Sequence, residues 1–209
     1  MKKGIIFDID GTLWNATEAV KEGWNKSFKM HGLPLVTAER IDSLMGKTGE
    51  QIRNAMFPDN PEAVTYLQEG MTYAKEMMAE GLVKIFPHEE EILKQLSKEY
   101  TLCILTNANQ AYIELLLKVT VFREYFTDLI SHGYNGKNKT ENMKILVERN
   151  SFDKAVYIGD TQDDYMFSQA AGLPFVFCEF GHGQAIDPEY SISDYSQLPQ
   201  VIKTIFNEK

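Results

Sequence analysis

The chain of 209 residues is long enough to bury one good hydrophobic core and to hold a second, smaller module. It carries 21 Lys and Arg against 30 Asp and Glu, and the resulting net charge of -9 argues against a nucleic-acid or anionic-membrane surface. Hydrophobic residues make up 44% of the chain, typical of a globular protein, and no segment approaches the roughly 18 consecutive apolar residues of a membrane span.

The first predicted element is a strand over residues 4–9, a short apolar run that ends in Asp8 and Asp10 and is followed by Gly11. Such a run is typical of a buried parallel strand, whose C-terminal end faces the ligand site of an open α/β sheet. Because residues i and i+2 of a strand point to the same face, the two carboxylates repel each other unless a cation or a proton lies between them. One acid can then serve as nucleophile or ligand while the other transfers protons. The alternative interpretation is an ordinary Asp-Gly turn.

Residues 15–84 show helical spacing throughout and no convincing strand. We therefore predict an all-helical insert that acts as a lid over the strand ends, although its apolar stripes also fit simple packing of a subdomain. The stripes are Val20, Trp24 and Phe28; Ile41, Leu44 and Met45, behind Thr37 as a candidate N-cap; and Val64, Leu67, Met71, Ala74 and Met78.

Four further apolar runs alternate with helical patterns in the second half of the chain, at residues 101–105, 128–131, 155–158 and 174–177. Alternating strands and helices imply right-handed crossovers and a parallel sheet. The predicted fold class is α/β, with a three-layer αβα Rossmann-like core formed by residues 1–14 and 85–209 and an all-helical cap formed by residues 15–84.

Polar groups also follow the second strand and precede a later helix. Thr106 and Asn107 offer a hydroxyl and backbone N–H groups that suit phosphate oxygens, although an ordinary helix N-cap explains them as well. Lys137 and Lys139 lie ahead of the helix that contains Met143, and either could reach an anion. At least one of the two is expected to be a surface lysine.

The strand over residues 155–158 repeats the opening pattern, because it is followed by Gly159 and Asp160, with Asp164 close behind. Four carboxylates then gather at one sheet edge, and a hard divalent cation such as Mg²⁺ balances their charge. A carboxylate held in line with a phosphoryl group can attack phosphorus to form an aspartyl-phosphate, while a neighbouring acid protonates the leaving oxygen.

These residues resemble the haloacid dehalogenase-like hydrolase superfamily, specifically its phosphatases with a helical cap after the first strand, such as the phosphoglycolate phosphatase-like members. The resemblance covers nearly the whole chain. It is carried by Phe7-Asp8-Ile9-Asp10-Gly11-Thr12-Leu13, by Ile104-Leu105-Thr106-Asn107, by a Lys ahead of a helix, and by Gly159-Asp160-Thr161 with Asp164 and the following Ala170-Ala171-Gly172.

The resemblance implies a role for each matching residue. Asp8 would be the nucleophile and a Mg²⁺ ligand, and Asp10 the general acid/base that also gives its backbone carbonyl to the metal. Thr106 would bind the phosphoryl group and Asp160 would be a further metal ligand. Asp164 would support the metal site indirectly or through a water molecule.

The lysine motif departs from the common pattern. Many relatives have Gly-Lys-Pro-x-Pro, whereas this chain has Gly136-Lys137-Asn138-Lys139-Thr140. We favour Lys139 for phosphate binding because its position resembles that of relatives whose lysine directly precedes the helix, with Lys137 as the alternative.

The expected function is a Mg²⁺-dependent phosphatase that hydrolyses a small phosphorylated metabolite through an aspartyl-phosphate. A sugar-phosphate mutase of the same superfamily is the alternative. A non-enzymatic phospho-acceptor receiver domain is less favoured, because it lacks an insert like residues 15–84 and its phosphoryl group must persist, which the acid at Asp10 opposes.

The remaining features of the sequence are interpreted as structural. Cys103 and Cys178 lie in apolar runs and are expected to be buried reduced thiols. The segment before Asp8 is too short for a signal peptide, so we expect a cytoplasmic protein. His182 is interpreted as a loop residue, whereas Trp14 and Asn15, just after the first motif, could line the pocket.

Overall fold

The computed structural model describes residues 1–60, 62–131 and 134–207, and the chain divides into two compact units. The core unit comprises Met1–Asn15 and Ile85–Lys209, and the helical unit comprises Ala16–Lys84. Asn15 therefore belongs with the core unit, one residue beyond the boundary expected from the sequence. Within the described ranges, no helix is both long enough and apolar enough to cross a membrane.

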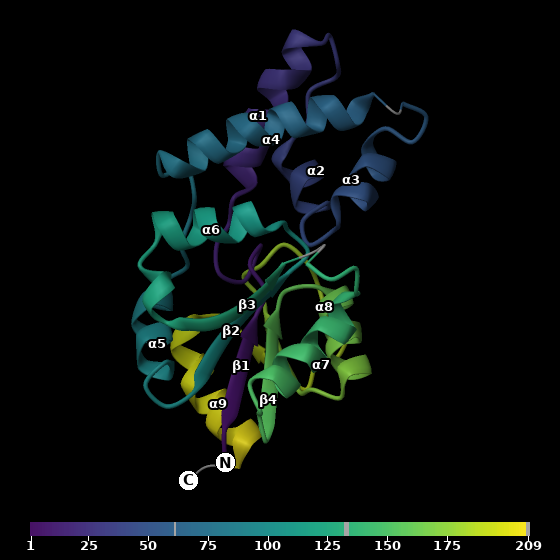
Figure 1. Ribbon diagram of the computed structural model, residues 1–209. Helices are drawn as coiled ribbons and strands as arrows, with labels where there is room; N and C mark the ends of the chain where they lie inside the picture. Colours follow the sequence, from purple (N-terminus) through teal and green to yellow (C-terminus); the bar gives the residue numbers. More distant parts are fainter. Residues whose placement is uncertain (61, 132–133, 208–209) are drawn as a thin grey trace. The chain divides into compact units, whose positions relative to one another are not determined.

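The core unit is built on a parallel sheet with the strand order β3-β2-β1-β4-β5-β6 (Figure 1). The chain adds β2 and β3 on one side of β1 and β4 to β6 on the other, so β1 and β4 flank the point where the topology reverses. Ligands of open α/β sheets bind at the carboxyl ends of the strands at this point. The strands are β1 (Lys3–Phe7), β2 (Thr101–Thr106), β3 (Phe126–Ser131), β4 (Lys154–Gly159), β5 (Phe175–Cys178) and β6 (Tyr190–Ile192).

All five strands expected from the sequence are present, and the parallel α/β architecture is confirmed. The sixth strand, β6, was not predicted, because its three residues form no apolar run. The strand expected at residues 128–131 begins two residues earlier, at Phe126.

Helices cover the sheet on both faces, because successive buried side chains of each strand point in opposite directions. Ile6 and Tyr157 pack with Met143 of α7, whereas Ile5 points the other way and is also fully buried. The core-unit helices are α5 (Glu89–Leu96), α6 (Gln110–Val119), α7 (Lys139–Arg149), α8 (Gln162–Ala171) and α9 (Leu198–Phe206), with short 3₁₀ turns at Phe122–Glu124 and Tyr195–Gln197.

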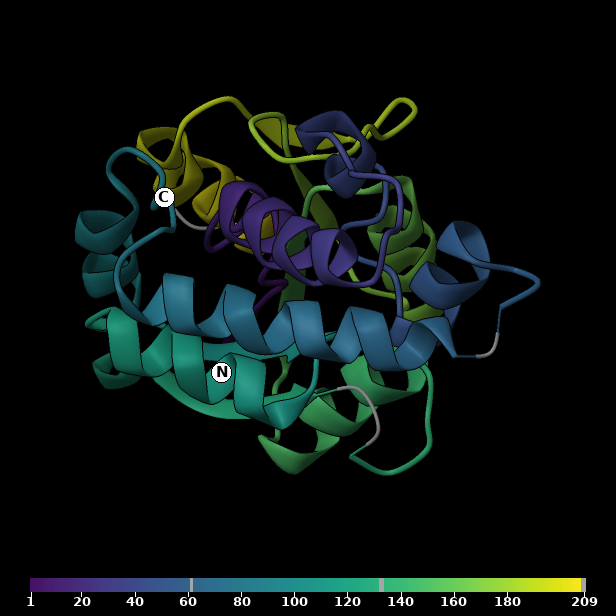
Figure 2. The ribbon, with the colours of Figure 1, turned by 90° about the horizontal axis from the view of Figure 1, so that it is seen from above.

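The described part of the helical unit contains α1 (Thr17–Met30), α2 (Ala38–Asp42), α3 (Gly49–Met56) and α4 (Ala63–Ala79). Thr37 is the N-cap of α2, as predicted: its hydroxyl oxygen accepts a hydrogen bond from the Arg40 backbone N–H. Helices α1 and α4 lie side by side (Figure 2).

The contact between α1 and α4 depends on two glycines. A Cβ atom added to Gly23 would lie 2.5 Å from the carbonyl oxygen of Gly70, so the two backbones nearly touch. The apolar stripe predicted for α4 is partly wrong, because it includes Val64, which is 37% exposed. The buried face of α4 consists of Ala63, Leu67, Gly70, Ala74 and Met78.

Candidate active site

Four charged side chains meet at the carboxyl ends of β1 and β4. Asp8 follows β1, Asp160 follows β4, Asp164 lies in the first turn of α8, and Lys139 is the first residue of α7. All four are buried, with exposed fractions of 5% or less. One carboxylate oxygen each from Asp8, Asp160 and Asp164 lies within 4.8 Å of the other two. Residues distant in the sequence thus form one compact charged cluster.

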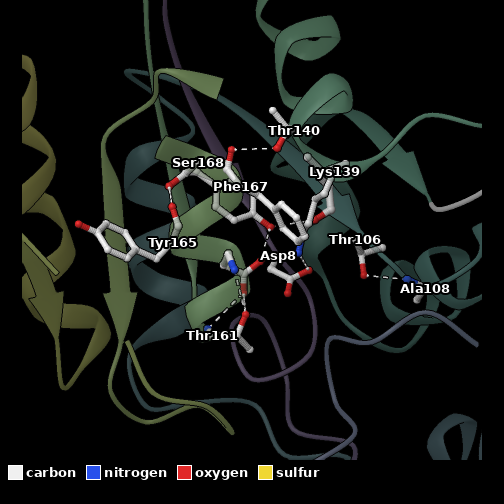
Figure 3. Close-up of polar contacts among 12 residues, drawn as sticks. Asp8, Thr106, Ala108, Lys139, Thr140, Thr161, Tyr165, Phe167 and Ser168 are labelled. Atoms are coloured by element: carbon white, nitrogen blue, oxygen red, sulfur yellow. Dashed lines mark hydrogen bonds and ion pairs between the residues drawn. The ribbon is translucent and has the colours of Figure 1, made fainter. Parts of the chain in front are cut away.

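Lys139 is the positive charge of this cluster. Its Nζ lies 2.6 Å from Asp164 Oδ1 and 3.2 Å from Asp8 Oδ1, and Figure 3 shows it beside Asp8. Asn138 and Glu141 form a capping box that starts α7, and this places Lys139 in the first turn. Lys137, two residues earlier, is exposed. Of the two lysines that the sequence left open, the structure brings only Lys139 into the cluster.

Asp164 is held by hydrogen bonds on both carboxylate oxygens. Its Oδ2 accepts hydrogen bonds from the hydroxyl and the backbone N–H of Thr161, at 2.7 and 3.2 Å, within the capping box of α8. Its Oδ1 accepts from Lys139 Nζ and, at 3.3 Å, from the hydroxyl of Tyr157. Asp164 therefore anchors Lys139 and starts α8 at the same time.

Asp8 and Asp160 each bury an oxygen that has no hydrogen-bond partner in the described part of the chain, Asp8 Oδ2 and Asp160 Oδ1. The other oxygen of Asp160 accepts a 2.7 Å hydrogen bond from the His182 backbone N–H. Burial raises the pKa of Asp8 to about 7, although Lys139 opposes the shift, and burial together with Asp164 raises the pKa of Asp160 well above its usual range. A buried carboxylate oxygen without a donor suits a hard cation.

Gly11 lets the loop after β1 pack against Asp160. Its φ of 78° is left-handed, and a Cβ atom at this position would lie 2.0 Å from Asp160 Oδ2. The glycine that follows the two acids is therefore required by close packing inside the site.

Asp10 has different surroundings from Asp8. Strand β1 ends at Phe7, so both acids lie beyond the strand, whereas the sequence placed Asp8 inside a strand over residues 4–9. Asp10 is half-buried, and its Oδ1 accepts hydrogen bonds from the Tyr112 hydroxyl and the Trp14 indole N–H. Burial raises the pKa of Asp10, while the hydrogen bond from Tyr112 lowers it.

Thr106 is the last residue of β2 and is buried at the same sheet edge (Figure 3). Phe7 pairs with Ile104 in the sheet, which brings Thr106 level with the turn that carries Asp8. The Thr106 hydroxyl oxygen accepts a 3.1 Å hydrogen bond from the Ala108 backbone N–H, and a hydroxyl that accepts one bond can still donate another. Asn107, the next residue, is half-buried.

Three site residues were not recognised in the sequence. The hydroxyls of Tyr112 and Tyr157 each contact a site carboxylate, but both tyrosines lie in apolar patterns that hide a hydroxyl. His182 was interpreted as a plain loop residue, yet its backbone N–H binds Asp160. Trp14, by contrast, was expected near the pocket and contacts Asp10.

Comparison with known proteins adds independent information. A family model described as "Haloacid dehalogenase-like hydrolase" matches residues 5–178. Among curated proteins, the phosphoglycolate phosphatase of Photorhabdus laumondii is 23% identical, over 96% of this chain and 92% of that protein. The phosphoglycolate phosphatase of Photobacterium profundum is 25% identical, over 96% of each chain.

Solved structures show the same fold. The crystal structure of a predicted phosphoglycolate phosphatase from Haemophilus somnus superposes with a TM-score of 0.85 at 17% identity and covers 96% of this chain and 98% of its own. The haloacid dehalogenase-like family protein SP0104 from Streptococcus pneumoniae also gives a TM-score of 0.85, at 20% identity with the same coverage. At these identities the likeness supports the fold.

Proposed function

The chain belongs to the haloacid dehalogenase-like hydrolase family, and from this premise we propose that it is a Mg²⁺-dependent phosphatase acting on a small phosphorylated metabolite through an aspartyl-phosphate on Asp8. The observation that carries the proposal is the buried pair of Asp8 and Lys139 at the topological switch point. The curated relatives named phosphoglycolate phosphatase support the choice of a phosphate ester as substrate.

The donor set of the cluster fits a magnesium ion. The unpartnered oxygens of Asp8 and Asp160 would hold the ion, with the backbone carbonyl of Asp10 as a further ligand. Asp164 would support the site indirectly, since Lys139, Tyr157 and Thr161 already bind its oxygens. The ion would supply positive charge that offsets the negative charge of the phosphoryl group.

The side chains then divide the reaction between them. The Asp8 carboxylate attacks phosphorus, the bond from phosphorus to the ester oxygen breaks, and Asp10 gives its proton to the departing oxygen. Water next attacks the phosphorus of the aspartyl-phosphate while Asp10 takes a proton, which releases phosphate and restores Asp8. Lys139, Thr106 and Asn107 would bind the phosphoryl oxygens throughout.

A small anionic substrate fits the charge distribution. The chain has a net charge of -9, and the three clustered carboxylates outnumber Lys139, so binding of an anion would need the positive charge of the metal ion in addition to that of Lys139. The proposal places the enzyme in the cytoplasm, which is supported by two buried free thiols, Cys103 and Cys178.

The test is an assay of the purified protein against a panel of phosphorylated metabolites with Mg²⁺, in which released inorganic phosphate is measured. We expect sustained turnover of at least one ester, loss of turnover with EDTA, and recovery when Mg²⁺ is added back. Formation of an isomerised sugar phosphate would instead identify a mutase. Slow phosphorylation of the protein without turnover would identify a phospho-acceptor domain.

A further inference from the structure

Tyr112 makes the shortest contact to the carboxylate of Asp10 among the described residues. Its hydroxyl donates a 2.6 Å hydrogen bond to Asp10 Oδ1, although the two residues are 102 positions apart. Helix α6 carries Tyr112, whose side chain is 5% exposed. None of the roles proposed above involves this residue.

Trp14 completes a triangle with these two residues. Its indole N–H points to Asp10 Oδ1 at 3.3 Å and to the Tyr112 hydroxyl at 3.2 Å, and the two rings pack edge to face with centroids 5.2 Å apart. Trp14 is fully buried, and its backbone carbonyl accepts a 2.9 Å hydrogen bond from the Gly11 N–H. The tryptophan is thereby fixed to the loop after β1 that carries Asp8 and Asp10.

Both donors bind the same oxygen of Asp10, Oδ1. A carboxylate held by one oxygen cannot rotate freely, and its second oxygen takes a fixed direction. A general acid must lie within hydrogen-bond reach of the proton's destination, and small errors in its position are costly in rate. The triangle provides this alignment from buried side chains that are themselves held by packing.

We propose that Tyr112 is a positioning residue which, with Trp14, holds Asp10 by Oδ1 and leaves Oδ2 to exchange the proton with the leaving group. The inference rests on the proposed function, because it assigns the proton transfer to Asp10. A tyrosine hydroxyl suits this task since it stays protonated at neutral pH and donates its hydrogen bond without competing for the proton.

The main test is Tyr112→Phe, which removes one oxygen and keeps the ring. We expect kcat/KM to fall by about tenfold or more for alkyl phosphates, whose leaving oxygen needs a proton, and by less than about threefold for 4-nitrophenyl phosphate, whose leaving group departs without one. An equal loss for both substrates, or no loss for either, would overturn the proposal.

Tyr195→Phe is the matched control. Tyr195 is fully buried, and its hydroxyl donates a 2.7 Å hydrogen bond to the backbone carbonyl of Thr12 in the same loop. The control variant therefore loses a hydroxyl that contacts the same loop but keeps every contact to Asp10. It should retain the wild-type ratio of kcat/KM between the two substrates. A ratio that changes as it does in Tyr112→Phe would mean that loop packing, and not the alignment of Asp10, is responsible.

A double-mutant cycle separates action through Asp10 from any independent effect. Asp10→Asn alone should lower kcat/KM for an alkyl phosphate by a factor on the order of 10²–10⁴. Adding Tyr112→Phe to Asp10→Asn should then change the rate by less than about twofold, because the group that Tyr112 aligns is already gone. Multiplicative losses would contradict the proposal.

Trp14→Phe, which removes the second donor, repeats the test at another position. It should shift the substrate ratio in the same direction as Tyr112→Phe, and an unchanged ratio in both folded variants would refute the positioning role. These outcomes are distinct from failure of the proposed function, which would appear as absence of phosphate release by the wild-type protein.

Discussion

The core unit and the helical unit bury different kinds of side chain. Within the described ranges, the core unit buries five acidic or basic side chains: Asp8, Glu89, Lys139, Asp160 and Asp164. The buried polar residues of the helical unit are Thr17, Asn25 and Ser27, and none of them carries a charge. Burying a charge is costly unless it is paired, and four of these five residues, all except Glu89, form the cluster at the carboxyl ends of β1 and β4.

The polar groups buried inside the helical unit bind both carboxylates and the backbone: the hydroxyl of Thr17 donates to Asp42 Oδ1, and that of Ser27 lies 2.7 Å from Glu69 Oε2. The amide of Asn25 donates to the Val36 carbonyl at 2.9 Å and accepts from the Val36 N–H at 2.8 Å, and the hydroxyl of Ser27 donates to the Tyr66 carbonyl at 2.9 Å. One unit is therefore organised around charge and the other around close packing. Substitutions in the two should have different consequences.

The largest effect is expected from Asp8→Asn, which removes the proposed nucleophile and proposed metal ligand. Turnover should be abolished, which corresponds to a loss of several kcal/mol or more in transition-state stabilisation. Asp153→Asn is the control, because this exposed acid lies just before β4 at the opposite end of the strand. Measured kcat/KM of Asp8→Asn within about tenfold of wild type would refute the assignment.

Lys139→Ala should cost about two orders of magnitude or more in kcat/KM, because it removes the buried charge beside Asp8. Lys137→Ala, an identical change at an exposed position two residues away, should cost less than about fivefold. Steady-state kinetics of the two variants provide the measurement. The reverse order would move the role to Lys137, and near-normal activity in both would exclude both assignments.

For substitutions in the helical unit we expect the main effect to be on the free energy of unfolding. Gly23→Ala should lower the free energy of unfolding by about 1–3 kcal/mol, since the new methyl group would collide with the backbone of α4. Gly49→Ala, in the same unit, places its methyl group in open space and should be close to neutral. Urea denaturation of both variants compares them, and equal midpoints would contradict the close crossing.

Glu89 is a buried acid of the core unit that lies outside the charged cluster, so its effect on stability can be measured separately from activity. Its Oε2 accepts a 3.0 Å hydrogen bond from the Phe86 N–H, and burial raises its pKa well above the usual range. A folded-state pKa above the unfolded one means that stability is lost as pH rises from the unfolded toward the folded value, by up to about 1.4 kcal/mol per pH unit.

Glu89→Gln should remove this loss. The variant is expected to lose less stability than wild type as the pH rises above about 4.5, the region where an unfolded glutamate ionises. Urea denaturation of both proteins at a series of pH values, with Mg²⁺ present, gives the two slopes. Parallel curves would show that Glu89 ionises in the folded protein as freely as in the unfolded one.

The sequence predicted the charged cluster because its signal is local. Asp8 and Asp160 each follow an apolar strand, and parallel strands bring such ends to one edge of a sheet. The contact between Tyr112 and Asp10 has no such signal, since an aromatic residue in an apolar stripe reveals nothing of its hydroxyl. The short strand β6 could not be predicted from the sequence, because three residues are too few to show a periodic pattern.

The helical unit shows the same limit in a different way. Apolar periodicity predicted that α4 exists and which residues form most of its buried face, but it placed Val64 inside. The crossing with α1 is set by glycine and alanine, whose small size permits close approach, and a hydrophobicity pattern gives them little weight.

The central claim, that Asp8 carries the phosphoryl group, can be tested by trapping. The enzyme is mixed with Mg²⁺ and a phosphate ester that it hydrolyses, quenched, and treated with borohydride, which reduces an acyl phosphate to the alcohol. Peptide mass spectrometry should then find Asp8 reduced to homoserine, only when substrate was present and never in Asp8→Asn. Reduction at another carboxylate, or turnover with no reduction at Asp8, would contradict the account.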